Sequence, residues 1–493
     1  MIRHVPVLIV IVPLVAALIV PLLALRRAAW ARTATLLALL GVVACSTTAL
    51  LCTLATGPLH YELGGWAPPW GIAYVLDPLS GGMALLIGIV ATLVAIYTRP
   101  YLNSWSTSRS GIFLSLFLLL VTGLLGIVAT GDLFNLYVFL EISSLAGYAL
   151  LASGSIRSAV ATFRYLIIGT IAATFYLLGV GYLYALTGSL NMADVAARLG
   201  IISHSGAFAV AITFIVIGLS IKAALFPLHG WLPDAYTYAP APVIGFISAV
   251  MAKVSAYALF RVLYFVLRPS EPMSQVLTGL SWMAAIAILA GSLLAVAQRD
   301  VRRMLAYSSI SQMGYIFLGL ALGTPAALKG ALLHVLNHAI MKGCLFLAAG
   351  GIQWRTGGYR LEDFTGMSRR MPLTMAAMVL AAISMIGLPP TAGFFSKWYL
   401  IQGAMEARAW VFVAVFIGSS LLSAVYFFRL IEWAYLRQPV SQTPLLSPPP
   451  YQELPMQMLV PIWTLATGIL LLGLFNQSVV DGIITYAIQS EGS

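Results

Sequence analysis

With 493 residues, of which 61% are hydrophobic and only 8% charged, the chain has the composition of a protein that lies mostly within a lipid bilayer. This composition excludes a water-soluble domain of any fold. The formal net charge of +11 does not indicate a nucleic-acid partner, because nearly all arginines lie in the short segments between apolar runs.

Apolar runs long enough to cross about 30 Å of hydrocarbon recur along the whole sequence. They are too long and too uniformly apolar for barrel strands, so each predicts a helix and the chain an all-α integral membrane protein. About fourteen transmembrane helices are expected, over residues 5–25, 33–56, 73–98, 111–130, 132–153, 159–187, 207–238, 242–267, 273–297, 301–323, 325–353, 371–404, 409–436 and 456–486.

The arginines of the connecting segments predict the orientation. The segments that follow odd-numbered helices hold sixteen arginines. The segments on the opposite side hold only Arg3, Arg198, Arg268 and Arg408. Because positive charge in short loops stays on the cytoplasmic side, we expect both termini outside the cytoplasm. The first apolar run lacks a small-residue cleavage site and is expected to remain as a helix rather than act as a signal peptide.

Cysteines and glycine-rich loops offer no sign of a cofactor. The chain has three cysteines, no CxxC pair and no phosphate-binding loop between a strand and a helix. We therefore expect no metal, no iron–sulfur cluster and no bound nucleotide.

Lysines, in contrast, are confined to the apolar runs. Arginine stays charged at any biological pH, whereas a desolvated lysine can lose its proton within the working range. Charge inside a bilayer indicates function, so these positions favour proton exchange. The five lysines are Lys222, Lys253, Lys329, Lys342 and Lys397.

Two helices are interrupted close to these lysines. Pro227 lies five residues after Lys222 in the seventh helix, and the pair Pro389 and Pro390 precedes Lys397 in the twelfth. A proline frees backbone carbonyls that only water, polar groups or ions satisfy at that depth, so the breaks predict hydrated cavities; a simple packing kink is the alternative.

Because the two breaks lie five helices apart, they predict inverted five-helix repeats formed by helices 4–8 and 9–13. The expected division of the chain is N-terminal helices 1–3 in residues 1–110, a first repeat in 111–268, a second repeat in 269–437, and a Pro-rich linker with the last helix in 438–493.

The fifth helix supplies an acid. Glu141 lies near the middle of the membrane, and Lys222 is its natural partner, because opening or closing such an ion pair would load or unload a proton. Lys253, near the middle of the eighth helix, would connect this end of the path to the eleventh helix. Asp132 and Asp234 are interpreted as helix caps rather than channel mouths.

Three polar side chains share one face of the eleventh helix. His334, His338 and Lys342 are spaced by four residues, which suits a proton relay. A zinc site is the weaker interpretation, since a third ligand is missing, and a structural role as polar contacts between helices stays open. Lys329 lies near the outer end of the helix and is expected to reach the interface.

These residues sit in motifs of a known superfamily. The segments KAALFPLHGWLPDAY, SISQMGY, HVLNHAIMKGCLFL and GLPPTAGFFSKW make almost the whole chain resemble the antiporter-like membrane subunits of respiratory complex I, membrane-bound hydrogenases and Mrp-type cation/proton antiporters. The segment TGDLFNLYVFLEISSLAGYALLA is most similar to the D-type subunit of the Mrp antiporters.

The resemblance implies roles for the same residues. Glu141 and Lys222 would form the ion pair of helices five and seven, Lys253 the connecting lysine, His334 and His338 the central axis, and Lys397 the exit residue, at which some relatives carry glutamate.

The resemblance also implies a function. The chain is expected to move protons for a multisubunit Na⁺/H⁺ antiporter in a bacterial or archaeal cell membrane, with other membrane subunits as partners, and to be a secondary transporter subunit rather than part of an enzyme. The alternative is a proton-pumping subunit of a redox complex, either an NADH:quinone oxidoreductase or a hydrogenase. An inert scaffold is disfavoured, because every expected titratable position is occupied.

Overall fold

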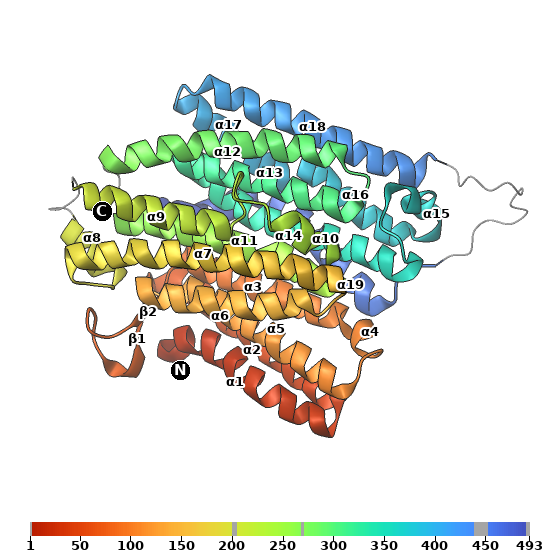
Figure 1. Cartoon of the computed structure of the whole chain (residues 1–493), viewed down its shortest axis with the longest axis horizontal. Helices are drawn as coiled ribbons and strands as arrows, with labels where there is room; N and C mark the ends of the chain where they lie inside the picture. Colours follow the sequence, from red (N-terminus) through yellow and green to blue (C-terminus); the bar gives the residue numbers. More distant parts are fainter. Residues whose placement is uncertain (1, 200–204, 268–270, 438–451, 490–493) are drawn as a thin grey trace, which may run out of the picture.

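The computed structural model describes residues 2–199, 205–267, 271–437 and 452–489. Within these ranges, twelve helices are long and apolar enough to cross a membrane. They run roughly parallel along the long axis of the molecule (Figure 1). They are α1 (Val5–Arg26), α2 (Ala28–Thr56), α3 (Pro78–Tyr97), α5 (Thr107–Ala129), α6 (Leu133–Ala152), α7 (Ile156–Thr187), α11 (Ala241–Phe260), α12 (Glu271–Ala297), α13 (Val301–Leu322), α14 (Pro325–Thr356), α18 (Trp410–Tyr435) and α19 (Met456–Leu474).

Two further crossings are broken helices. The first consists of α9 (Gly206–Lys222) and α10 (Leu232–Tyr238), and the second of α16 (Pro372–Ile386) and α17 (Ala392–Glu406). With the twelve long helices they complete the expected set, so the predicted all-α membrane fold with broken helices seven and twelve is confirmed.

The first break lies earlier than the proline that causes it. Helix α9 ends at Lys222, and α10 begins at Leu232, within the crossing that the sequence predicted over residues 207–238 with an interruption at Pro227. The ring of Pro227 would clash with the carbonyl four residues before it, which belongs to Ala223, and the helix therefore stops before that residue. The lysine thus occupies the last turn of a half-helix.

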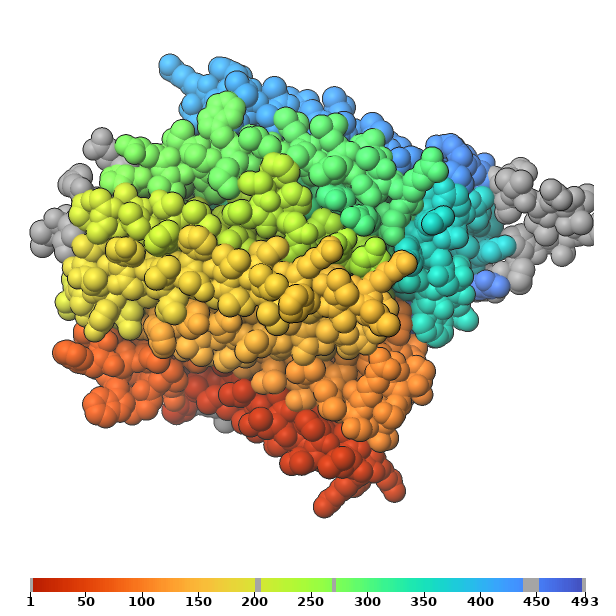
Figure 2. Space-filling view, in the orientation of Figure 1, coloured from red at the N-terminus to blue at the C-terminus, as the bar shows by residue number. Residues whose placement is uncertain are grey.

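The order of the crossings repeats. Helices α5, α6, α7, α9 with α10, and α11 form one group of five, and α12, α13, α14, α16 with α17, and α18 form the next, with the broken helix fourth in each. Because the first group has an odd number of crossings, the second group starts on the opposite side of the membrane. The two groups therefore form an inverted repeat. In space-filling view the helices follow one another largely in sequence order from one edge to the other (Figure 2).

The second helix of each group starts with the same cap. The carboxylate of Asp132 accepts a hydrogen bond from the backbone N–H of Asn135 at 2.7 Å, and that of Asp300 accepts one from Arg303 at 3.0 Å. Burial raises the pKa of both carboxyls above the ordinary value of an aspartate. The cap predicted for Asp132 is therefore present.

Asp234 does not cap a helix. It lies in the first turn of α10, where its carboxylate pairs with Arg164 at 3.3 Å and with Arg303 at 3.4 Å. The expected cap is wrong, because Trp231 occupies the N-cap position. The ion pairs instead tie α10 to α7 of its own repeat and to α13 of the other.

A β hairpin lies between α2 and α3, where no strand was predicted. Strand β1 (Leu59–Glu62) pairs antiparallel with β2 (Ala73–Leu76), with Leu59 opposite Leu76. Since β2 occupies the start of the predicted third helix, α3 begins only at Pro78, behind the capping side chain of Asp77. The hairpin and α8 (Met192–Leu199) lie at the same end of the bundle, named here the hairpin end (Figure 1).

Short elements complete the fold. The last predicted helix is split after Leu474, and the linker residues 438–451 lie outside the described ranges, as does Arg268. The remaining elements are α4 (Arg99–Leu102), α15 (Met367–Arg370), α20 (Asn476–Val479), α21 (Thr485–Gln489), the 3-10 turns Ile2–His4, Leu63–Gly65 and Leu361–Phe364, and the π-helical turns Arg261–Leu267 and Val480–Ile484.

Burial separates the centre of the bundle from its outer faces. Every residue of α11 is buried, and α11 packs against α14, whose membrane window is also almost wholly buried. The outer faces of α1, α7 and α18 expose large apolar side chains such as Leu22, Phe163 and Leu421. Polar residues on α11 and α14 are therefore shielded from lipid by the surrounding helices.

Because α17 packs closely on α14, a larger side chain at their contact is expected to destabilise the protein. A side chain at Gly403 would meet the backbone nitrogen of Ala327 at 2.3 Å, whereas one at Gly418 on α18 has open space around it. We expect Gly403→Val to lower the stability of the assembled protein by about 1–3 kcal/mol through overpacking. The thermal midpoint in detergent should fall for Gly403→Val and stay at the native value for Gly418→Val; equal midpoints would contradict the contact.

Candidate functional site

The broken helix of the first repeat brings Lys222 to Glu141. The lysine Nζ lies 3.2 Å from Oε1 of Glu141 and donates a hydrogen bond to the hydroxyl of Ser144 at 2.6 Å. The lysine is 3% exposed and the carboxylate 26% exposed. The lysine is therefore covered by this chain on all sides, whereas part of its carboxylate partner is open at the surface of the chain.

The break itself is held by side chains. The indole of Trp231 donates a hydrogen bond at 3.0 Å to the carbonyl of Ile221, one of those that the interrupted helix leaves free. Pro227 lies in the segment that joins α9 to α10. The half-helix ending at Lys222 is thus fixed in place, and its charged end remains beside Glu141.

Lys253 lies at the centre of the bundle on α11. It is 1% exposed, and its ammonium donates to the backbone carbonyl of Ser248 in the preceding turn. No carboxylate pairs with it among the described residues. Its helix α11 packs against α14 and also contacts α9 and α6, so the lysine lies on the element that joins the Glu141–Lys222 pair to α14.

Helix α14 carries the two histidines side by side. Their ring centroids lie 5.7 Å apart in stacked orientation, and both side chains are fully buried. His334 Nδ1 is 2.8 Å from the Ser396 hydroxyl and Nε2 is 2.9 Å from the amide oxygen of Gln312. Neither ring nitrogen of His338 has a protein partner within the described residues.

Lys342 continues this face of α14. Its ammonium donates to the carbonyl of Leu305 at 2.8 Å and to the hydroxyl of Ser308, both on α13. The partners are neutral, as they are for Lys253. The spacing of four residues thus places His334, His338 and Lys342 along one buried stripe, as the sequence predicted.

The broken helix of the second repeat holds Lys397 in a different way. Its ammonium donates to the carbonyls of Met385 and Ile386 at 2.8 and 3.1 Å and to the hydroxyl of Ser420 at 3.2 Å. These carbonyls belong to the end of α16, immediately before the break at Pro389 and Pro390. The freed carbonyls therefore bind the lysine, and no carboxylate of the described residues takes part.

Charge is unbalanced along this array. The four buried ammonium groups share one carboxylate, Glu141, among the ion pairs of the described residues. Charging all of them together would place uncompensated positive charge in the bundle, at a cost of several kcal/mol per ion. The arrangement favours states in which some of the lysines are neutral.

Unpaired polar atoms mark the same region. Buried atoms without a hydrogen-bond partner in the described residues include both ring nitrogens of His338, Gln312 Nε2, Asn337 Oδ1 and Ser248 Oγ. Buried polar groups left over by the protein are usually satisfied by ordered water. The unpartnered atoms lie beside the buried lysines and histidines of the array, where water would have polar groups to bind.

The neutral hydrogen-bond partners of the array were not predicted from the sequence. Ser144, Ser308, Ser396 and Ser420 each bond a residue of the array from another helix, and Gln312 bonds His334. A signal was present in the motif SISQMGY, which contributes Gln312 and lies on α13. Lys329, in contrast, is half-buried near the start of α14 and stays outside the array.

Several known proteins are similar to this chain in sequence and fold. The family described as NADH:quinone oxidoreductase/Mrp antiporter, TM, matches residues 130–423. NADH-quinone oxidoreductase subunit N of Desulforudis audaxviator is 57% identical over 99% of both chains. The D-type subunit of the Na⁺/H⁺ antiporter of Alkalihalophilus pseudofirmus is 32% identical over 76% of this chain and 75% of that protein.

A solved structure agrees over the whole length. A chain of the membrane-bound sulfane sulfur reductase, described as an archaeal respiratory membrane complex, superposes with a TM-score of 0.91 at 32% identity, covering 99% of this chain and 97% of that one. That protein is a component of a multisubunit membrane complex, which supports the expectation of other membrane subunits as partners.

These similarities correct one expectation. The sequence suggested a subunit of a secondary transporter and not of an enzyme, whereas the relative at 57% identity is a subunit of an oxidoreductase. That expectation is wrong, and the specific likeness to the D-type antiporter protein is limited to 32% identity. Both interpretations assigned the same role to the buried lysines, so the residues of the site did not separate them.

Proposed function

Because the chain belongs to the NADH:quinone oxidoreductase/Mrp antiporter family of membrane proteins, we propose that it is a proton-translocating subunit of a redox-driven membrane complex. The observation that carries this proposal is the set of four buried lysines and two buried histidines in neighbouring helices, with a single carboxylate partner among the described residues. Electron transfer takes place in neighbouring subunits, and this chain supplies the proton path.

The path begins in the first repeat, residues 111–268. Water reaches Glu141, and separation of its ion pair with Lys222 lets the lysine release a proton toward Lys253. Re-forming the pair favours the charged lysine again, because an opposite charge within about 4 Å stabilises an ammonium. Each cycle of opening and closing therefore passes one proton inward.

The path continues in the second repeat, residues 269–437. From Lys253 the proton moves along His334, His338 and Lys342 to Lys397 on the broken helix α17. The carbonyls that hold Lys397 belong to the break, so a small movement there changes how many hydrogen bonds its ammonium makes. By the distribution of arginines, the hairpin end of the bundle faces away from the cytoplasm.

Proton flux in inverted membrane vesicles that contain the whole native complex tests this function. With an electron donor and a quinone acceptor supplied, we expect acidification of the vesicle lumen. Adding Na⁺, K⁺ or Li⁺ to vesicles energised by an unrelated pump should leave the pH gradient unchanged. Collapse of that gradient on addition of a cation, without any redox substrate, would overturn the proposal in favour of antiport.

Removing the carboxylate should weaken the path without closing it. We expect Glu141→Gln to slow proton translocation roughly tenfold, the effect of about 1.4 kcal/mol on a barrier, because the lysine keeps its bond to Ser144 but loses its charged partner. The measurement is the initial rate of lumen acidification per electron transferred. Native rates in Glu141→Gln would show that the pair takes no part in translocation.

A further inference from the structure

A cavity of about 300 Å³ lies at the end of the bundle opposite the hairpin end. Its walls are the first turns of α2, the last turn of α3, the short helix α4, and single residues of α5 and α19. Two arginines, Arg32 and Arg99, line it together with apolar side chains such as Leu36, Ile96 and Leu114. The cavity therefore combines a cationic part with an apolar part, and its lining residues all lie outside the lysine array.

The two arginines of the cavity take part in no ion pair within the described part of the chain. Arg32 donates a hydrogen bond at 2.6 Å to the amide oxygen of Asn103, a neutral group that leaves the charge of the guanidinium uncompensated. The side chain of Arg99 is exposed and makes no hydrogen bond within the described ranges. Because a guanidinium carries five N–H donors, both side chains keep donors that can bind an anion.

The lack of a counter-charge follows from the sequence. Residues 1–131 contain two acidic residues, Glu62 and Asp77. Glu62 ends β1 and Asp77 caps the start of α3, so both lie at the hairpin end, away from the cavity. Glu453, which precedes α19, accepts a hydrogen bond from the hydroxyl of Thr374 at the start of α16. The carboxylates nearest in sequence to the lining residues are therefore distant or already bound.

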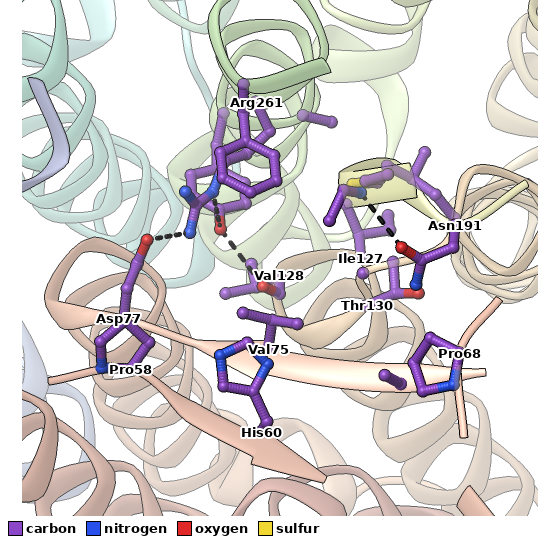
Figure 3. Close-up of a pocket in the computed structure, with 18 of the residues that line it drawn as sticks. Pro58, His60, Pro68, Val75, Asp77, Ile127, Val128, Thr130, Asn191 and Arg261 are labelled. Carbon is purple, nitrogen blue, oxygen red and sulfur yellow. Dashed lines mark hydrogen bonds and ion pairs between the residues drawn. The ribbon is translucent and has the colours of Figure 1, made fainter. Parts of the chain in front are cut away.

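A second cavity, beneath the β hairpin, shows the opposite arrangement. There the guanidinium of Arg261 contacts the carboxylate of Asp77, as the dashed line between the two labelled residues in Figure 3 shows. An arginine paired in this way has its charge balanced by the protein. Of these two cavities, the one lined by Arg32 and Arg99 thus offers unpaired positive charge in the described part of the chain.

Two helices begin beside the arginines. Helix α2 starts at Ala28 and α19 at Met456, and no side chain caps either helix. The free backbone N–H groups of a first turn and the helix dipole both favour negative charge. Since Ala29 and Gln457, the second residues of these helices, line the cavity, the helix starts add to the attraction for an anion.

The apolar part of the cavity distinguishes a lipid from a free anion. A free phosphate would use the arginines and leave the apolar side chains without a partner. Beyond the cavity, α2 continues with the exposed side chains Leu37 and Leu40, which are 64% and 52% exposed. An acyl chain that leaves the cavity therefore has apolar surface to follow, and a basic pocket between membrane helices suits a lipid headgroup.

We propose that this cavity binds a phospholipid with an anionic headgroup, with the phosphate against Arg32 and Arg99 and the start of one acyl chain beside Leu36 and Leu114. By the distribution of arginines, the lipid belongs to the cytoplasmic leaflet. It would connect the N-terminal helices α2 and α3 to α19, the last crossing. The binding does not depend on what drives proton translocation.

Cross-linking with a defined lipid tests the site. The native complex is placed in phosphatidylcholine nanodiscs with a trace of phosphatidylglycerol that carries a diazirine in its acyl chain, and labelled peptides are identified by mass spectrometry. We expect labelling within residues 29–36 and 95–102. A phosphatidylcholine probe with the same diazirine should label these peptides several-fold less. Equal labelling by the two probes would overturn the proposal, because negative charge would then not be recognised.

The variant Arg99→Gln tests the arginine, with Arg26→Gln as the matched control. Both arginines are exposed at the same end of the bundle and neither is in an ion pair of the described residues, but Arg99 lines the cavity and Arg26 does not. One arginine beside an anionic headgroup contributes about fivefold to binding. Labelling by phosphatidylglycerol should therefore fall about fivefold in Arg99→Gln and stay near native in Arg26→Gln. Equal labelling in the two variants would refute the site.

Two further measurements separate a lipid from a free anion. Ala29→Trp keeps both arginines but places a large side chain at the exposed rim, so it should reduce labelling by phosphatidylglycerol several-fold. Excess inorganic phosphate at constant ionic strength should leave the labelling of the native complex unchanged, because phosphate cannot fill the apolar part. Native labelling in Ala29→Trp, or loss of labelling on addition of phosphate, would contradict a bound lipid.

Discussion

Replacement of Lys222 by alanine is expected to abolish proton translocation by the complex while leaving its assembly intact. The ammonium is the buried member of the pair with Glu141, and no other titratable group of the described residues occupies the end of the half-helix α9. A positioned proton-transfer group contributes about 10²–10⁴-fold to a rate, so the residual flux should be at most about one per cent. The measurement is lumen acidification per electron transferred in vesicles of equal complex content.

Lys329 provides the matched control. It is a lysine of the same chain on a membrane helix, but it lies half-buried near the start of α14 and outside the array. Lys329→Ala should retain native translocation and native assembly on a blue native gel. Strong translocation by an assembled Lys222→Ala complex would remove the pair from the mechanism.

The sequence predicted the crossings well, because each is a long apolar run with a clear physical cause. Both broken helices were found from prolines next to lysines, and their positions in the two repeats followed. The exact end of the first half-helix at Lys222 comes from the structure, since a proline excludes helix for several residues before itself.

The β hairpin could not be predicted in the same way. Its strands have only four residues each, too short for their pattern of apolar residues to be distinctive, and they flank a segment rich in proline and glycine. Pairing of Leu59 with Leu76 across such a loop depends on how α2 and α3 bring its ends together. Short strands of this kind are defined by tertiary context rather than by local pattern.

The titratable residues of the site were predictable, but their partners were not. A lysine in an apolar run is visible in a sequence, whereas Ser144 bonds Lys222 across 78 residues and Ser396 contacts His334 across 62. Serines are common in membrane helices, so nothing local distinguishes those that bond a buried charge. The neutral environment of Lys397 likewise became clear only from the folded positions of Met385 and Ile386.

The two repeats thus use different means to hold a lysine at a broken helix. In the first, Lys222 pairs with the carboxylate of Glu141 at 3.2 Å, which stabilises the charged form. In the second, Lys397 is bound by carbonyls and a hydroxyl, whose dipoles stabilise an ammonium less strongly than a full negative charge does.

A change of Lys397 to glutamine should therefore stop translocation, although the amide can still donate hydrogen bonds to the carbonyls of Met385 and Ile386. We expect a loss of about 10²-fold or more in proton flux, as for Lys222→Ala, because the group at this position must gain and lose a proton. Assembly and the thermal midpoint of the complex should stay near native values, since the carbonyls of Met385 and Ile386 still accept hydrogen bonds from the glutamine amide.

The variant Lys397→Arg tests whether Lys397 must gain and lose a proton or only needs to carry a positive charge. Arginine keeps the positive charge and the hydrogen bonds but does not deprotonate in proteins, so it should fail as completely as glutamine if proton exchange at this position is required. If the arginine variant translocated protons at the native rate while the glutamine variant did not, the lysine would act only as a fixed charge. Loss of flux in both variants, with both complexes assembled, is the outcome that a proton carrier at the second break requires.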